Sequence, residues 1–346
     1  MAGKLAVVLF NLGGPDSPEA VQPFLFNLFN DPAIISVPWP IRPLLARLIS
    51  SRRAPIAREI YAEIGGRSPL VPLTEEQADA LERVVGERWE GEVRTFIAMR
   101  YWHPMADETA RAVKAYAPDQ IVLLPLYPQF STTTTGSSVK DWHRAAAAAG
   151  LDAPTRTVCC YPLEKGWIAA QAELVRAAVE RSEGRVRVLF SAHGLPKKVI
   201  ASGDPYQWQV EQTAAAVAAE VGDAMPEWLV CYQSRVGPLE WIGPSTEDEI
   251  ARAGSDGVSL VVVPIAFVSE HSETLVELDI EYGKLAAEKG VTGYVRVPAV
   301  ATHPAFIGGL AEVVAEAVRR PAGTVCPNGS GRICPAEHRR CPASAD

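Results

Sequence analysis

Four glutamates follow one another at helical spacing in VSEHSETLVELDIEY, residues 268–282. Glu270, Glu273, Glu277 and Glu281 are three, four and four residues apart, so at about 100° per residue they share one stripe of an α-helix. Like charges at this spacing repel each other, which an ordinary surface helix avoids by alternating acids with bases. Carboxylates with an imidazole beside them, here His271, suit a divalent first-row cation that is bound and released, or a group that takes protons from a substrate. The competing interpretation is a solvated helix face whose first acid is favoured by the helix dipole.

A second histidine stands at the end of another apolar run. His193 lies in FSAHGLP, where a predicted strand gives way to a glycine-containing turn, so its imidazole is expected to face a ligand site. An imidazole there can accept a proton near neutral pH or bind a metal ion. The alternative is a histidine whose ring is satisfied by backbone groups.

Short apolar runs alternate with helical patterns along the whole chain. Strands are predicted at 4–10, 93–99, 120–126, 155–160, 185–190, 228–232, 258–266 and 293–297, and helices at 74–88, 106–116, 165–182, 207–221 and 272–288. The two halves also echo each other, because LAVVLFNLGGP resembles VRVLFSAHGLP and VLLPLYPQFS resembles VVVPIAFVS. Alternation of buried, β-branched strands with helices predicts an α/β protein of two similar, doubly wound, Rossmann-like domains with parallel sheets.

We expect an N-terminal domain at 1–148, a C-terminal domain at 149–303, a helix at 304–320 that packs back on the first domain, and a tail at 321–346. In such sheets ligands bind beyond the carboxyl ends of the strands. Polar motifs follow predicted strands at 11–15, 100–103, 129–138, 191–196, 233–237 and 269–277. Their convergence from both halves predicts an interdomain cleft.

Composition narrows the class of protein. The formal net charge of −8 gives no indication of a nucleic-acid partner. No stretch approaches the roughly 20 apolar residues of a membrane-spanning helix, and the apolar run at the start is too short for a signal peptide. We therefore expect a cytoplasmic protein, whose six cysteines are ligands or buried thiols in preference to disulfides.

Segment 23–49 is unusually apolar and is interrupted by four prolines, at positions 32, 38, 40 and 43. It is interpreted either as a connecting segment packed on the core or as an apolar lip that admits a large flat ligand and makes peripheral contact with the inner face of a membrane. Arg52 and Arg53 follow it, and paired arginines suit substrate carboxylates or lipid headgroups. An exposed pair without a role is the alternative.

Eight motifs together resemble the ferrochelatase family, in order and over about residues 5–310. They are NLGGP, FLFNLFNDPAII, EIYAEIGGRSPL, MRYWHP, LPLYPQFSTTTTGSS, FSAHGLP, CYQSRVGPLEWIGP and FVSEHSETLVELDIEY. The resemblance implies a lyase, a metal chelatase of heme biosynthesis that inserts Fe²⁺ into a porphyrin with release of two protons. The apolar lip favours a more apolar porphyrin such as protoporphyrin IX, and the more carboxylated coproporphyrin stays open as the alternative. The alternatives are a cobalt or nickel chelatase acting on another tetrapyrrole, and a non-enzymatic tetrapyrrole- or iron-binding protein. The oligomeric state stays open, a homodimer included.

The resemblance also implies roles for the residues singled out above. His193 is the proton acceptor and a metal contact, Glu273 is its partner, and His271 supports Glu273. Glu277 and Glu281 continue the acidic stripe as a route for iron or departing protons, in a helix that the family tends to widen into a π-type turn. Porphyrin-binding positions, at the propionates or the pocket wall, are implied for Asn11, Leu12, Arg52, Arg53, Tyr61, Ser68, Arg100, Tyr101 and Trp241.

The tail carries three cysteines among prolines and glycines. Cys326, Cys334 and Cys341 are separated by seven and six residues, and a segment of this composition needs a metal centre to organise it. One interpretation is a 2Fe-2S cluster, which some ferrochelatases hold through C-terminal cysteines and one earlier cysteine. The alternatives are zinc held by the same thiols with His338, and a disordered tail.

The fourth cluster ligand must come from earlier in the chain. The position of that ligand in the family falls on Thr132 here, so the sequence departs from the pattern. Cys159 or Cys160 is expected to replace it, and only one of them, because adjacent strand residues point to opposite faces. Cys231 lies inside a predicted strand and is expected to be a buried core thiol.

Overall fold

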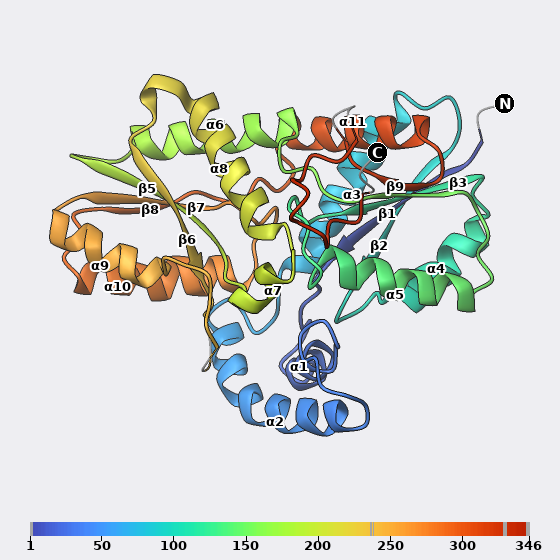
Figure 1. Cartoon of the computed structure of the whole chain (residues 1–346), viewed down its shortest axis with the longest axis horizontal. Helices are drawn as coiled ribbons and strands as arrows, with labels where there is room; N and C mark the ends of the chain where they lie inside the picture. Colours follow the sequence, from blue (N-terminus) through green and yellow to red (C-terminus); the bar gives the residue numbers. More distant parts are fainter. Residues whose placement is uncertain (1–2, 236, 238, 328–330, 344–346) are drawn as a thin grey trace. The chain divides into compact units, whose positions relative to one another are not determined.

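The computed structural model describes residues 3–235, 237, 239–327 and 331–343 (Figure 1). The chain forms two compact units. Unit 1 comprises Met1–Cys160 and Ala311–Gly329, and unit 2 comprises Tyr161–Leu310 and Ser330–Asp346. The division after Cys160, where the sequence predicts one after residue 148, reflects the strand at Thr155–Val158, which pairs into the first sheet.

Unit 1 is built on a five-stranded parallel sheet of order β2-β1-β3-β4-β9. The strands are β1 Leu5–Asn11, β2 Val93–Met99, β3 Gln120–Pro125, β4 Thr155–Val158 and β9 Gly323–Val325. All seven residues of β1 are buried, as expected for a central parallel strand that is covered on both faces. Strand β9 is not predicted by the sequence, because three residues between glycines and prolines carry no readable periodicity.

Helices complete unit 1: α1 Val21–Phe29, α2 Ile41–Ala62, α3 Leu70–Gly86, α4 Ala106–Tyr116 and α5 Thr135–Ala148. One face of the sheet packs on α4 and α5, where the Phe10 and Trp142 rings lie 6.0 Å apart in the core. Helices α1 and α2 pack on each other through a cluster that includes Phe24, Ala54 and Tyr61 (Figure 1).

Unit 2 is built on a four-stranded parallel sheet of order β6-β5-β7-β8. Its strands are β5 Val186–His193, β6 Glu227–Gln233, β7 Ser259–Pro264 and β8 Tyr294–Arg296. Its helical segments are α6 Lys165–Glu180, α7 Lys197–Ala201, α8 Tyr206–Val221, a 3-10 turn Gly222–Ala224, α9 Thr246–Asp256, the π-helix η2 Glu273–Glu281 and α10 Tyr282–Glu288. Helix α11, Pro304–Arg319, spans the division between the units. Helices lie on both faces of the sheet, with α9 and α10 sharing one core with β5 and β7 (Figure 1).

The predicted fold class is confirmed. Both sheets are parallel, and the order β2-β1-β3-β4 of the first is repeated as β6-β5-β7-β8 in the second. The four-strand unit is therefore duplicated, as the echoed motifs indicate. Among the residues that the structure describes, no helix has the length and apolar character needed to cross a membrane.

Candidate active site

An imidazole and a carboxylate face each other beyond the end of β5. His193 is the last residue of that strand, and its Nδ1 lies 2.9 Å from Oε2 of Glu273, the first residue of η2. The two side chains are 39% and 26% exposed, so both remain accessible to a ligand. Gly194 allows the tight turn that follows, because an added Cβ would lie 3.0 Å from the carbonyl oxygen of Gln233. Three local features therefore position this pair: the end of β5, the close backbone approach at Gly194 and the start of η2.

The acidic segment is a π-helix and not the α-helix that the spacing predicts. The N–H of Tyr282 bonds to the carbonyl of Glu277 five residues earlier, which is the π pattern. A stripe counted at 100° per residue is therefore wrong for this segment, whereas the widened turn implied by the family resemblance is confirmed. The wider turn allows Glu273 and Glu277, four residues apart, to converge on Ser234.

Glu277 is held by the end of strand β6. Its oxygens accept hydrogen bonds from Gln233 Nε2 at 3.0 Å, from Ser234 N at 2.8 Å and from Ser234 Oγ at 2.5 Å. Ser234 adopts a φ of 60°, in the left-handed region that few residues other than glycine occupy. Such strain persists where surrounding contacts fix it, and here it directs two donors of one residue at a single carboxylate.

The charges of His193, Glu273 and Glu277 shift one another's pKa values. Partial burial lowers the pKa of His193, but the carboxylate of Glu273 outweighs this effect and raises the pKa above the ordinary value of 6.5. Burial raises the pKa of Glu273, but the imidazolium outweighs it and holds the pKa below the usual range. Burial and then the charge of Glu273 raise the pKa of Glu277. The resting site therefore holds an ion pair with a second carboxyl that tends to keep a proton.

The two outer acids of the segment lie elsewhere. Glu270 pairs with Arg296 Nη1 at 2.6 Å and accepts a hydrogen bond from the backbone N–H of Ala299. It therefore stabilises the end of β8, and in the described part of the chain no hydrogen bond joins it to His193, Glu273 or Glu277. Glu281 is exposed at the end of η2. The sequence spacing alone could not separate these two acids from the inner pair.

Two further predicted residues surround the pair. His271 is 8% exposed, its Nδ1 donates to the carbonyl oxygen of Ser269 at 3.1 Å, and its ring lies against Phe267. Its charge contributes to the lowered pKa of Glu273. Trp241 forms a bridge with Pro196, and an added Cβ on Gly194 would lie 3.4 Å from its ring, so it adjoins the turn after His193.

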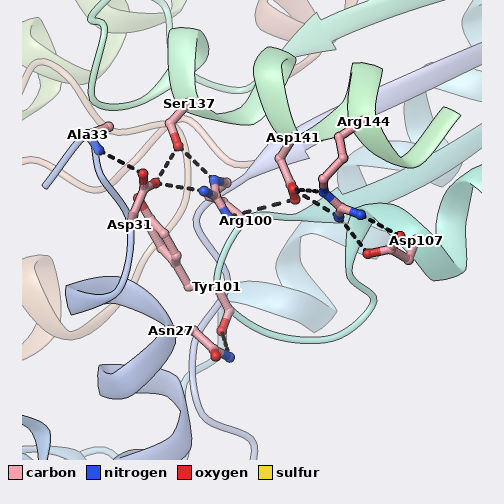
Figure 2. A network of polar contacts seen from close by, with 9 residues as sticks. All are labelled: Asn27, Asp31, Ala33, Arg100, Tyr101, Asp107, Ser137, Asp141 and Arg144. Atoms are coloured by element: carbon pink, nitrogen blue, oxygen red, sulfur yellow. Dashed lines mark hydrogen bonds and ion pairs between the residues drawn. The ribbon is translucent and has the colours of Figure 1, made fainter. Parts of the chain in front are cut away.

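In unit 1, Arg100 and Tyr101 follow strand β2 and share one acid (Figure 2). Asp31, whose side chain is 2% exposed, accepts from Arg100 Nη2 and from Tyr101 Oη, both at 2.8 Å, and from the hydroxyl of Ser137. It also accepts the N–H of Ala33 at 2.8 Å. Asp31, which follows α1 within the lip segment, thus fixes that segment to the end of β2 and to α5. Sequence reasoning missed it, although a lone acid in an apolar run is the signal that could have found it.

The other predicted porphyrin-binding positions have separate environments. Asn11 is buried, donating to Thr74 and accepting from the N–H of Leu12. Tyr61, Tyr101 and Leu12 belong to one apolar cluster with α1. Ser68 is buried in the turn before α3, whereas Arg52 and Arg53 are exposed on α2.

Three thiols meet in unit 1. The Sγ atoms of Cys159, Cys160 and Cys326 all lie within 4.8 Å of one another, and the N–H of Cys159 bonds to Val325 of β9. Strand β4 ends at Val158, so both cysteines lie past its end and the expected alternation between faces is wrong here. Thiols at this mutual distance are suited to bind one soft metal centre.

The remaining tail cysteines are buried in unit 2. Cys334 is 5% exposed and Cys341 is 8% exposed, and Nε2 of buried Gln209 donates to Cys334 Sγ at 3.1 Å. The ring of His338 instead lies against Trp208. A disordered tail is therefore wrong for residues 331–343. Cys231 is fully buried in the core, as predicted.

The described residues thus form a duplicated doubly wound α/β protein with an imidazole–carboxylate pair at the end of one strand. Solved structures with this fold include SirB from Bacillus subtilis with Fe3+, with a TM-score of 0.52 and 13% identity over 91% of this chain and 95% of that chain. The sirohydrochlorin chelatase SirB from Bacillus subtilis subspecies spizizenii in complex with cobalt has a TM-score of 0.53 and 12% identity over 92% and 97%. At such identities the likeness shows the fold alone.

The sequence comparisons define the family. The model of the family Ferrochelatase matches residues 4–318. The ferrochelatase of Caulobacter vibrioides (strain NA1000 / CB15N) is 59% identical over 345 residues, 99% of this chain and 98% of that protein. The ferrochelatase of Phenylobacterium zucineum (strain HLK1) is 58% identical over 341 residues, 98% and 97% of the two chains. The chain belongs to the ferrochelatase family.

The ion pair predicts how the His193 ring titrates. Because Glu273 raises the pKa of His193, replacing it in Glu273→Gln should move the ring's titration to lower pH. Histidine NMR on the substrate-free protein measures this directly. Glu281→Gln, an exposed acid at the far end of the same π-helix, is the matched control and should leave the titration in place. An unchanged His193 titration in Glu273→Gln would contradict the pairing.

Proposed function

We propose that the protein inserts Fe²⁺ into a porphyrin, preferentially protoporphyrin IX, to form heme and release two protons. The observation that carries this proposal is the His193–Glu273 pair with Glu277 beside it, in a chain of the ferrochelatase family. The lyase reaction needs a group that takes pyrrole protons and oxygen or nitrogen ligands that pass iron on. This group of residues offers both.

The proton balance defines the work of His193. A metal-free porphyrin carries two N–H protons, and each iron that enters displaces both. His193 accepts a proton only as neutral imidazole, whereas its raised pKa favours imidazolium in the resting pair. Turnover should therefore increase as pH rises through that raised pKa, because the accepting form is populated above it.

Iron is proposed to contact His193, Glu273 and Glu277. Carboxylate and imidazole donors of this kind suit a first-row divalent ion, and an incoming cation lowers the cost of deprotonating Glu277. Glu281 is proposed as an outer residue of the route, and His271 as a support for Glu273. The porphyrin is proposed to be bound by Asn11, Leu12, Arg52, Arg53, Tyr61, Ser68, Arg100, Tyr101 and Trp241.

Two alternatives are disfavoured. A carrier of tetrapyrrole or iron needs no proton acceptor opposite an acid, so the His193–Glu273 pair supports an enzyme. A cobalt or nickel chelatase for another tetrapyrrole would not be expected at 59% identity to a ferrochelatase over nearly the whole chain.

Anaerobic turnover tests the proposal. Purified protein with Fe²⁺ should form heme from protoporphyrin IX faster than from coproporphyrin, measured by absorbance. His193→Ala should lose at least about 10²-fold in turnover, the lower range for a positioned acid–base group, while porphyrin binding measured by fluorescence persists. Near-normal turnover in that variant would remove His193 from the mechanism, and absence of heme formation by the wild type would overturn the function.

We propose in addition that a 2Fe-2S cluster is bound by Cys326, Cys334, Cys341 and either Cys159 or Cys160. Support comes from the three buried thiols grouped within 4.8 Å and from the Gln209 N–H directed at Cys334 Sγ, since N–H donors at the sulfurs are usual around such clusters. When bound, the cluster would supply a cross-link that organises the tail. Zinc with His338 as a ligand is the alternative.

Colour distinguishes the two metals. We expect brown protein with about two irons and two sulfides per chain, in line with cluster composition. The colour should be lost in Cys326→Ser, Cys334→Ser and Cys341→Ser, and kept in Cys231→Ser and His338→Ala. Colourless protein that contains zinc and releases it in His338→Ala would contradict the cluster and leave the chelatase proposal intact.

We propose that the lip segment and α2 contact the cytoplasmic face of an anionic membrane. Trp39, Ile41 and Leu44 are 76%, 58% and 72% exposed, and α2 carries arginines at positions 42, 47, 52, 53 and 58. Apolar side chains beside basic ones are the pattern of a helix that lies on an anionic surface. Leu28, by contrast, is partly buried and packs against the α1–α2 cluster.

Vesicle binding tests this contact. Leu44→Asp should weaken sedimentation with phosphatidylserine vesicles severalfold, because a charge would have to enter the apolar layer. Ala147→Asp adds the same charge at an exposed position of α5 and should bind as the wild type does. Equal binding by all three proteins would remove α2 from the account.

A further inference from the structure

Two hydroxyl groups in unit 2 each stand between two carboxylates. Ser234 Oγ lies 3.4 Å from Glu273 Oε2 and 2.5 Å from Glu277 Oε2. Tyr282 Oη lies 3.2 Å from Glu277 Oε1 and 2.9 Å from Oε1 of Glu247. With the 2.9 Å contact of His193 to Glu273, these links form one unbroken line of hydrogen-bonding groups from the imidazole to Glu247.

The number of protons available to these hydrogen bonds shows that one of the two acids beside Tyr282 must be protonated. A hydroxyl carries one proton and can donate to only one carboxylate at a time. Both contacts of Tyr282 are hydrogen bonds only if one of its two acids is itself protonated and donates to Oη. The shorter contact of Tyr282 Oη, 2.9 Å, is to Glu247, and the longer one, 3.2 Å, is to Glu277, so the hydroxyl is best placed to donate to Glu247 and to accept from Glu277. Tyr282 then donates onward to Glu247.

Glu247 is the last group in this line of hydrogen bonds. It lies in the first turn of α9, and its side chain is only partly buried. In the part of the chain that the structure describes, its Oε2 has no hydrogen-bond partner, while Oε1 is bonded to Tyr282. Glu270 also has a buried Oε2 without a partner, but its other oxygen is paired with Arg296, whereas among the described residues no base forms an ion pair with Glu247. Glu247 therefore has an acceptor atom to spare.

We propose that Tyr282 and Glu247 form a proton relay that carries the protons of porphyrin metallation from Glu277 to helix α9. The proposal rests on the proposed function, since only a reaction that releases protons at His193 needs such an exit. It deepens that function by assigning a route that leaves η2 sideways through α10 and α9. Among the described residues no hydrogen bond joins Glu281 to Glu277, so the geometry does not support the predicted proton route along the helix to Glu281.

Each transfer conserves atoms and charge. His193 takes a pyrrole proton at one ring nitrogen and gives the proton on the other to Glu273. Ser234 receives that proton from Glu273 as it passes its own to Glu277, and Tyr282 receives one from Glu277 as it passes its own to Glu247. Both hydroxyls are restored, and the net change is one proton moved from His193 to Glu247. The sequence then repeats for the second proton after Glu247 loses the first to water.

Removing the hydroxyl of Tyr282 tests the relay without removing the tyrosine ring. Tyr282→Phe keeps the ring, which is 5% exposed in the core, and breaks the link between Glu277 and Glu247. The matched control is Tyr294→Phe, which removes a hydroxyl that donates to the carbonyl of Leu278 in the same π-helix but lies outside the line. Glu247→Gln breaks the relay at its terminus.

We expect Tyr282→Phe and Glu247→Gln to lose about 10-fold in turnover, less than a direct acid–base group because water can substitute for a relay. The KM for Fe²⁺ should not change, the solvent deuterium isotope effect on kcat should increase, and millimolar imidazole should restore turnover. Tyr294→Phe should match the wild type in each respect, with thermal unfolding confirming that all three variants fold.

Wild-type turnover and isotope effect in Tyr282→Phe would overturn the relay, as would an equal, imidazole-insensitive loss in Tyr294→Phe. These outcomes are distinct from failure of the proposed function, in which the wild-type protein itself forms no heme from Fe²⁺ and protoporphyrin IX.

Discussion

The ion pair between His193 and Glu273 is the interaction on which the rest of unit 2 depends for its chemistry. It joins the end of the central strand β5 to the start of η2, so the two elements that carry functional groups are fixed by the charges they present. The pairing also sets three protonation states at once. It favours imidazolium at His193 and carboxylate at Glu273, and the charge of Glu273 in turn favours the neutral form of Glu277. With His193 protonated, Glu273 ionised and Glu277 neutral, the three side chains together carry a net charge of about zero.

This arrangement needs local backbone that an ideal fold would avoid. A π-helix makes weaker use of its hydrogen bonds than an α-helix, and a serine with φ of 60° carries strain. Both deviations act on the same carboxylates, because the wide turn brings Glu273 and Glu277 together and Ser234 satisfies them from the other side. The repulsion between neighbouring acids is offset by these donors and by His193. Strain at a strand end is therefore linked to the placement of two like charges.

Most of the fold could be predicted because its signal is local. Buried parallel strands appear in the sequence as short apolar runs, and eight strands could be predicted from them. Strand β9 could not, because it has three residues and depends on its pairing with β4. The site was predictable in type but not in detail. The spacing of the four glutamates in 270–281 gave no reason to distinguish between them. Only the π-helix, which brings Glu273 and Glu277 together, and the pairing of Glu270 with Arg296 show that their environments differ. Asp31, Tyr282 and Glu247 were missed for the same reason, since their partners lie 35 or 70 residues away and leave no pattern in the sequence. The alternation rule failed at Cys159 and Cys160 because β4 ends at Val158, before either cysteine, and not at residue 160 as predicted.

Duplication explains why the two units carry different chemistry on one plan. Phe10 pairs with Pro125 in the first sheet as Ser191 pairs with Pro264 in the second, so the registers place Leu12 where unit 2 has His193. By the same registers, Asn11 pairs with Met99 as Ala192 pairs with Tyr232, so Arg100 and Tyr101 stand where unit 2 has Gln233 and Ser234. Unit 1 therefore carries Leu12, Arg100 and the fully buried Tyr101 at these strand ends, and unit 2 carries His193, Gln233 and Ser234. The side chains at the strand ends therefore differ between the two sheets, while the order and register of the strands that hold them are kept.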